Sequence, residues 1–388
     1  MAKRSKYSGL QSVAYSQRKR RGLLVKFFNF LLILLSLTST VTLVVALCAP
    51  HISPESSTLC SIVALAAPYN YVCCLLLLLM WVVRWRRWAL VMLVPVVWGS
   101  FYVGRFVQVD FMIDREVGGK NDLRIMTYNT HSMGRMSSNN PTVLDSILQK
   151  SYEQNADIIC FQEYNLYDSV GLRKFDSVLC DYPFKAYSIE AECKKLTQKH
   201  RGFLTISKYK ILHSKYYNLT KGINTGFLVS EILVGSDTVK IVNVHLQTTG
   251  IGTLNKDGGV RTMVSDSGVM DVGGKMFDHL NANFKLRAPQ AQRLRSVVDS
   301  LGSGVIVAGD FNSIPISYCY NTIIGDNLTD AFVEGGKGYG YTYRELLGVL
   351  RIDYVLFDDL RWRCVEYNSP DWQYSDHNPV VVTLKRDS

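Results

Sequence analysis

The sequence predicts an α/β fold in which packed β-sheets are flanked by helices, preceded by three transmembrane helices. Long uncharged apolar stretches dominate the N-terminal region, whereas short β-rich runs alternate with amphipathic segments from Asp122 onward. Two of these runs meet at Gly235 and Ser236, as the strands of a hairpin would. Mixed strands and helices with hairpin-like pairs are typical of sheets covered by helices.

Three apolar stretches, at 27–49, 59–83 and 88–105, predict membrane-crossing helices. The first contains one amide, Asn29, and no charge. About 20 apolar residues cross a hydrocarbon core, and the polar stripe of a helix in a soluble core is missing here. The third stretch is short and crosses only if flanking residues are included. A cleaved signal peptide is the alternative for the first stretch, which is long for that role.

Basic residues set the expected orientation, because Lys and Arg next to a span stay on the cytoplasmic side. Eight of them precede the first stretch, and Arg84, Arg86 and Arg87 separate the second from the third. Three crossings would deliver the rest of the chain to the extracytoplasmic side, periplasmic or extracellular, and a non-crossing third stretch would invert this. We therefore expect a basic cytoplasmic N-terminus at 1–26, a transmembrane region at 27–109 and a soluble domain at 110–388.

The net charge of +10 belongs to the N-terminal region. Residues 1–109 hold twelve of the 43 Lys and Arg residues and one of the 33 acidic residues, which leaves 31 basic and 32 acidic residues for the remainder. The soluble domain is thus almost neutral. Its composition gives no support for a broad basic face that binds nucleic acid.

The cysteines show no zinc-type spacing. Five of the nine lie in the soluble part: Cys160, Cys180, Cys193, Cys319 and Cys364. An odd number allows at most two disulfides there, and we expect buried free thiols.

Eight runs in the soluble domain predict strands: 123–128, 157–161, 202–206, 226–234, 239–246, 304–308, 352–357 and 379–384. Helices are expected at 141–154, where Asn140 can cap and Pro141 suits the first turn, and at about 277–301. The stretch 249–274 is rich in Gly, Ser and Asp without apolar periodicity, which predicts a long surface loop.

Polar side chains follow these strands at the point where the apolar run stops. They are Asn129, Glu163, His245, Asp310 with Asn312, Asp353, and Asp376 beside His377. Each alone is more often a turn former or a solvated group. As a set, Asn129, Glu163 and Asp376 offer the oxygen ligands that Mg²⁺ or Mn²⁺ prefers, and the two histidines with nearby acids suit proton transfer. Zinc is disfavoured, because thiolate and histidine clusters are missing.

The series that ends in Asn129, Glu163, His245, Gly-Asp310-Phe-Asn312, Ile-Asp353-Tyr and Ser-Asp376-His377 resembles the endonuclease/exonuclease/phosphatase superfamily. The resemblance covers roughly residues 122–386. It implies a four-layer α/β sandwich and a metal-dependent hydrolase of phosphoester bonds, a nuclease or a phosphodiesterase.

The resemblance also implies roles for the individual residues. Glu163 would be the principal ligand of Mg²⁺ or Mn²⁺, with help from Asn129 and Asp376. Asp310, beside Asn312, would orient and deprotonate the attacking water. His377, held by Asp353, would contact the phosphate, and His245 would donate to a phosphate oxygen.

The substrate stays open between nucleic acid, phospholipid or sphingolipid headgroups and small phosphorylated metabolites. Arg287 is a candidate for substrate binding, with a solvated helix charge as the alternative. The expected partners are the lipid bilayer and a phosphodiester, and no protein partner follows from the sequence. A catalytically inactive, membrane-bound binding module is the rival function, although such a module would not need all of these residues.

Overall fold

The computed structural model describes residues 2–84, 87–109, 119, 122–134, 142–166, 169–188, 201–220, 225–249, 269–345 and 348–386. The chain divides into two compact units. The helical unit comprises Met1–Leu47 and Val63–Phe101, and the sheet unit comprises Cys48–Ile62 and Tyr102–Ser388.

The helical unit consists of α1 (Ala2–Leu47), α3 (Ala67–Val83) and most of α4 (Trp88–Val103), and the short α2 (Leu59–Ala64) begins in the sheet unit. Several polar contacts join α1 to α3. Trp81 Nε1 donates to Ser36 Oγ at 2.8 Å, and Asn70 Nδ2 donates to Ser39 O at 3.0 Å. Such bonds between helices are typical where the surroundings offer no water.

One described helix, Leu23–Leu47 within α1, is long and apolar enough to cross a membrane. The predicted second span, 59–83, is wrong in its bounds, because α2 ends at Ala64 and Pro68 lies in the first turn of α3. Proline suits that turn, where its missing N–H costs no helical hydrogen bond. α3 and α4 then have 17 and 16 residues, fewer than the about 20 that cross a hydrocarbon core. By length and composition, the described residues support one of the three expected spans.

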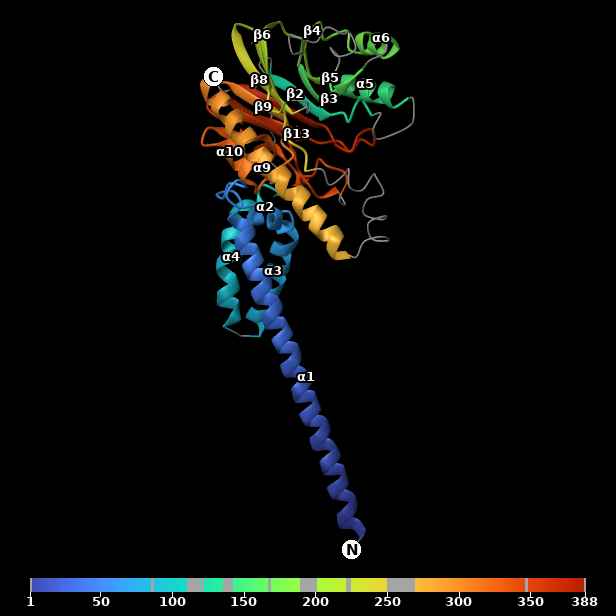
Figure 1. Ribbon diagram of the computed structural model, residues 1–388, viewed down its shortest axis with the longest axis vertical. Coiled ribbons are helices and arrows are strands. Elements are labelled where there is room, and N and C mark those ends of the chain that lie inside the picture. Colours follow the sequence, from blue (N-terminus) through green and yellow to red (C-terminus); the bar gives the residue numbers. More distant parts are fainter. Residues whose placement is uncertain are drawn as a thin grey trace. The chain divides into compact units, whose positions relative to one another are not determined.

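Two six-stranded sheets form the centre of the sheet unit (Figure 1). The first has the order β10-β12-β9-β8-β7-β6 and the second the order β13-β14-β2-β3-β5-β4. The strands of the first are β6 (Ile211–Asn218), β7 (Gly226–Val234), β8 (Asp237–His245), β9 (Val305–Asp310), β10 (Leu328–Asp330) and β12 (Asp353–Asp358). Those of the second are β2 (Asp122–Asn129), β3 (Ile158–Asn165), β4 (Phe184–Tyr187), β5 (Arg201–Ser207), β13 (Trp362–Asn368) and β14 (Val380–Arg386). A small ribbon pairs β1 (Val107–Gln108) with β11 (Gly338–Tyr339).

Three apolar cores hold the layers together. The core between the sheets includes Ile125 of β2 and Ile306 of β9. A second core packs the β2–β3 sheet against α5 (Val143–Glu153) and α6 (Ser169–Val178), and a third packs the β8–β9 sheet against α9 (Val269–Leu301) and α10 (Tyr318–Ile324). The short α11 (Ala331–Gly335) follows β10. The order helices, sheet, sheet, helices confirms the predicted four-layer α/β sandwich (Figure 1).

All eight predicted strands are present, and the hairpin at Gly235 and Ser236 joins β7 to β8. No strand was predicted at the four sheet edges, which β4, β6, β10 and β13 form. In β6, for example, no residue is buried, so the run shows no apolar alternation. The predicted loop 249–274 is wrong at its end, since α9 begins at Val269. The rest of that loop and the expected cap at Asn140 and Pro141 lie outside the described residues.

The cysteines of the described residues are free thiols. Cys160, Cys319 and Cys364 are buried, as expected, and Cys180 is exposed. Cys193 lies outside the described residues.

Candidate active site

Four of the candidate residues lie at strand ends on the face between the two sheets. Side chains alternate along a strand, so Asn129 shares the face of Ile125 in β2, and Asp310 shares the face of Ile306 in β9. The same alternation brings His245 of β8 and Asp353 of β12 to this face. The polar side chains at these strand ends therefore meet at one edge of the apolar core between the sheets.

The strand register places three of these residues side by side. His245 pairs with Asp310 across the parallel β8–β9 ladder, and Asp353 pairs with Asp310 across the antiparallel β9–β12 ladder. Gly309 permits this approach, because its φ is 149° and a Cβ there would lie 2.0 Å from the Val244 carbonyl oxygen. This explains the glycine of the Gly-Asp-Phe-Asn motif.

A bulge turns Glu163 into the site. Phe161 and Tyr164 of β3 both belong to the core against α5 and α6, although simple alternation would put them on opposite faces. The register with β5 shifts between them, and Glu163 has a φ of 49°. A bulge of this kind re-aims a side chain. Glu163 Oε1 lies 3.3 Å from Asn129 Nδ2 and 3.5 Å from His245 Nε2.

Asn312 lies beyond the strand that carries Asp310. β9 ends at Asp310, and Asn312 has a φ of 50°. Its backbone N–H donates to Asp310 Oδ1 at 2.7 Å, and its Nδ2 donates to Asp310 Oδ2 at 3.0 Å. A tight turn thus joins the two side chains.

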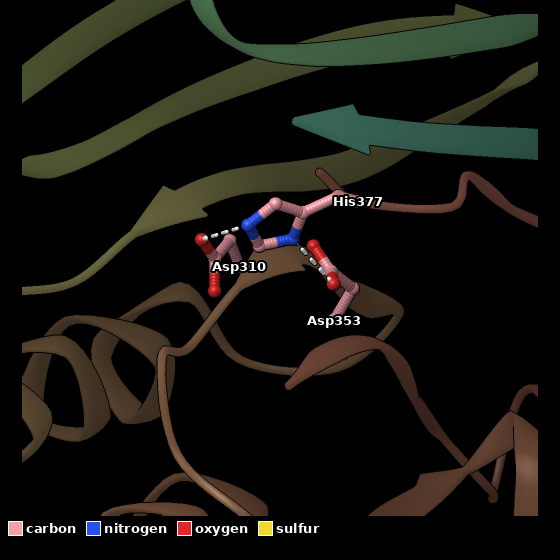
Figure 2. Close-up of side chains that lie close together, drawn as sticks. All are labelled: Asp310, Asp353 and His377. Carbon is pink, nitrogen blue, oxygen red and sulfur yellow. Dashed lines mark hydrogen bonds and ion pairs between the residues drawn. The ribbon is translucent and has the colours of Figure 1, made fainter. Parts of the chain in front are cut away.

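His377 lies between two carboxylates (Figure 2). Its Nδ1 is 2.9 Å from Asp353 Oδ2, and its Nε2 is 3.8 Å from Asp310 Oδ2. The ring also meets Tyr343 edge-on at 5.1 Å. Burial alone would lower the pKa of His377, but the charges of Asp353 and Asp310 outweigh it and raise that pKa well above its usual value.

Asp310 is the hub of the cluster. Its Oδ2 accepts from Asn129 Nδ2 at 3.0 Å and lies 3.6 Å from His245 Nε2. Burial raises the pKa of Asp310 above the ordinary value, and the neighbouring histidines oppose that rise. A buried carboxylate with a raised pKa can accept a proton near neutral pH.

Two of the three expected metal ligands, Glu163 and Asp376, are partly exposed, whereas Asn129 is buried. The side chains of Glu163 and Asp376 are 30% and 17% exposed, against 1% for Asp310. The amide of Asn129 donates to the carboxylates of Glu163 and Asp310, and its Oδ1 accepts from the His131 N–H. Asp376 Oδ1 accepts from Ser375 Oγ at 3.3 Å. This oxygen-rich, partly accessible set fits Mg²⁺ or Mn²⁺.

Among the His, Cys, Asp and Glu side chains of the described residues, one group has ligand atoms close enough together to hold a metal: Asp310, Asp353 and His377. It is buried, and the Asp353–His377 hydrogen bond already uses one ligand atom of each residue. The donor set around Glu163 is therefore the better match for a hard cation.

Arg287 lies in the interior. It is fully buried on α9, where its Nε donates to the Gln247 carbonyl at 2.6 Å and its Nη1 to Ser313 Oγ at 3.1 Å. Burial lowers the pKa of Arg287 to about 10. These hydrogen bonds link the segments that follow His245 and Asp310. The buried guanidinium therefore holds these two segments together and is not exposed to solvent.

His131 was missed by the sequence reasoning. Its Nδ1 lies 3.0 Å from Asp376 Oδ1, and its side chain is 12% exposed. It begins a run of three residues with positive φ, His131, Ser132 and Met133, and backbone strain of this kind collects at functional sites. Its place two residues after Asn129 was the available signal.

Comparisons with known proteins give both solved structures and family models that resemble this chain. Solved structures that resemble it include an endonuclease/exonuclease/phosphatase family protein from Leptotrichia buccalis C-1013-b, with 16% identity, 69% of this chain and 100% of that chain covered, and a TM-score of 0.47. The human nocturnin catalytic domain with bound sulfate has 17% identity, 71% and 97% coverage and a TM-score of 0.49. Sphingomyelinase C from Streptomyces griseocarneus has 19% identity, 68% and 99% coverage and a TM-score of 0.44.

The curated proteins give no match. A family model described as a domain of unknown function matches residues 26–106, which hold the apolar helices. Residues 126–377, well over half of the chain and including every strand-end residue described above, match the model of the Endonuclease/Exonuclease/phosphatase family. The chain therefore belongs to the endonuclease/exonuclease/phosphatase family, whose members are hydrolases of phosphoester bonds.

Proposed function

We propose that this protein is a membrane-anchored hydrolase that cleaves phosphodiester bonds with the help of a divalent cation. The observation that carries the proposal is the convergence on Asp310. Asn129, Asn312, His245 and His377 all approach its Oδ2 atom within 3.0–3.8 Å, from two sheets and two turns. In-line attack on a phosphate needs an aligned water, a proton acceptor and donors for the developing charge.

Glu163, Asn129 and Asp376 would hold the cation, Mg²⁺ or Mn²⁺. Family enzymes generally use a divalent metal, and this set offers carboxylate and amide oxygens only. A divalent cation bound there would withdraw charge from the phosphoryl oxygens of the substrate.

The remaining residues would handle the proton and the phosphate. Asp310, whose pKa is raised by burial, accepts the proton of the attacking water, and Asn312 orients that water. Asp353 keeps the Nδ1 proton of His377 in place, so that Nε2 faces the reacting phosphate as a donor. His245 donates to a second phosphate oxygen.

The membrane anchor is supported by the apolar helix Leu23–Leu47, which has eight Lys and Arg residues at or before Lys26 on one side. A single crossing puts the sheet unit outside the cytoplasm, and so do three crossings. α3 and α4 have nearly the same length, so they cross together in a thin bilayer or not at all. A reporter fused after Ser388 should therefore be active only in the extracytoplasmic compartment. A cytoplasmic signal would mean an even number of crossings.

The decisive experiment uses the full chain in detergent micelles with Mg²⁺. DNA, RNA, sphingomyelin and bis-p-nitrophenyl phosphate are offered separately, with and without chelator, and the matched variant is Asp310→Asn. Hydrolysis of at least one substrate that stops with chelator and with Asp310→Asn supports the proposal. Intact substrate throughout would favour the inactive binding module, and the substrate that is cleaved decides between nucleic acid, lipid headgroup and small phosphodiester.

A further inference from the structure

We propose that Arg105, just after the last apolar helix, is a positioning residue for the catalytic acids. The proposal rests on the proposed function, since it concerns the same site. It assigns the segment 102–108, called here the connecting segment, to the framework of the active site.

The connecting segment is built into the sheet unit. α4 ends at Val103, and the next strand, β1, pairs antiparallel with β11. The backbone N–H of Gly340 donates to the Phe106 carbonyl at 2.9 Å. The second part of the sheet unit accordingly starts at Tyr102, before β1.

Arg105 connects two parts of the sheet unit through its side chain and its backbone. Its Nη1 donates to the Pro315 carbonyl at 3.0 Å, and its guanidinium lies 5.1 Å from the centre of the Tyr320 ring. Its own carbonyl accepts from Arg351 Nη2 at 2.8 Å. An arginine that only marked the end of a membrane span would turn its charge to water or lipid headgroups.

Both contacts of Arg105 lead to catalytic strand ends. Pro315 belongs to the turn that follows Asp310 and Asn312, and Arg351 precedes Asp353 by two residues. The hydroxyl of Tyr354 bridges the two segments, because its oxygen lies 2.6 Å from the Ser313 carbonyl oxygen and 2.8 Å from the Arg351 carbonyl oxygen and its one proton is shared between them. Arg105 thus contacts both of the segments that carry Asp310 and Asp353.

Arg351 depends on these contacts because it is a buried charge. It is fully buried and pairs with Asp330 at 2.8 Å, while its Nε and Nη1 atoms have no hydrogen-bond partner among the described residues. The Arg105 carbonyl is therefore one of few groups that satisfy it. A buried polar group that loses a partner is destabilised, so the position of the connecting segment matters to the backbone before Asp353.

The test compares Arg105→Gln and Arg105→Lys with Arg84→Gln, all in the full chain in micelles. Arg84 also flanks an apolar helix, but its contact is Asn29 of the helical unit. Arg105→Gln should lower kcat about tenfold with little change in KM, the scale expected when support of a catalytic group is lost. Arg105→Lys should recover part of that loss, and Arg84→Gln should behave as wild type.

Hydrogen exchange of residues 311–316 and 350–354 supplies a readout that does not need activity. It should speed up in Arg105→Gln and stay unchanged in Arg84→Gln. Wild-type kcat with wild-type exchange in Arg105→Gln would overturn the inference, as would a general loss of stability with no local change in exchange. An inactive wild-type protein would instead refute the proposed function, and the exchange data would still decide whether Arg105 holds these segments.

Discussion

The two sheets make different contributions to the candidate site. The sheet with β8, β9 and β12 supplies His245, Asp310 and Asp353, whose side chains are between 1% and 8% exposed. The sheet with β2 and β3 supplies Asn129, which is also buried, and Glu163, whose side chain is 30% exposed. A dry setting suits proton transfer, because burial shifts pKa values toward neutrality. A cation that enters from solvent needs an accessible carboxylate. The burial of Asp310 and the exposure of Glu163 therefore fit their proposed roles in proton transfer and in cation binding.

The largest effect is expected for Asp310→Asn, which removes the proposed proton acceptor. We expect turnover to fall about a thousandfold, since general base catalysis contributes 10²–10⁴-fold, and steady-state hydrolysis of a generic phosphodiester measures it. The matched control is Asp358→Asn, a buried aspartate at the far end of β12 that accepts from the Gly304 and Leu360 N–H groups. That control should lose some stability but keep its turnover. Equal rates in both variants would contradict the role of Asp310.

His377→Ala is expected to lower kcat by about a hundredfold, the cost of removing one donor to a developing negative charge. The loss should persist at saturating Mg²⁺, because extra cation does not replace a donor on the buried side of the site. The exposed His213 on β6 provides the control, His213→Ala, with wild-type kinetics expected. If high Mg²⁺ restored the kcat of His377→Ala, the proposed separation of the buried proton-transfer residues from the cation site would be contradicted.

Glu163→Gln should weaken binding of the cation and leave the buried proton-transfer residues unaffected. The variant keeps the shape and loses one negative charge, so Mg²⁺ should bind about tenfold more weakly and high Mg²⁺ should restore part of the rate. A titration of activity against Mg²⁺ gives the shift, with the surface variant Glu153→Gln as control. An unshifted titration curve would remove Glu163 from the set of metal ligands.

Ser375→Ala should have the smallest effect, on stability. Ser375 is buried, and its Oγ donates to the Asn129 carbonyl at 2.8 Å, which joins the turn before β14 to the end of β2. Loss of one buried hydrogen bond costs about 1 kcal/mol and should lower the thermal midpoint by a few degrees. Ser300→Ala, which removes a bond to the Val297 carbonyl within α9, should change the midpoint less. The reverse order would show that Ser375 adds no support to the site.

Strand alternation allowed much of the fold and site to be predicted. The buried strand β9 shows a dense apolar run, and the polar residue that follows this run, Asp310, marks the end of the strand. The edge strand β6 escaped prediction because none of its residues is buried and its sequence therefore carries no burial pattern. The second apolar stretch was misread for a related reason, since hydropathy alone does not detect the break before Pro68.

The α/β class, the apolar N-terminal helix and the identity of the strand-end polar residues could be predicted from the sequence, because these features depend on local composition and on a two-residue period. Tertiary structure alone decided how those residues face one another. The bulge at Glu163, the turn at Asn312 and the burial of Arg287 depend on pairing with strands and helices far away in the sequence. The connecting segment shows the same limit, since Arg105 resembles an ordinary flanking charge until the fold brings Pro315 and Arg351 to it.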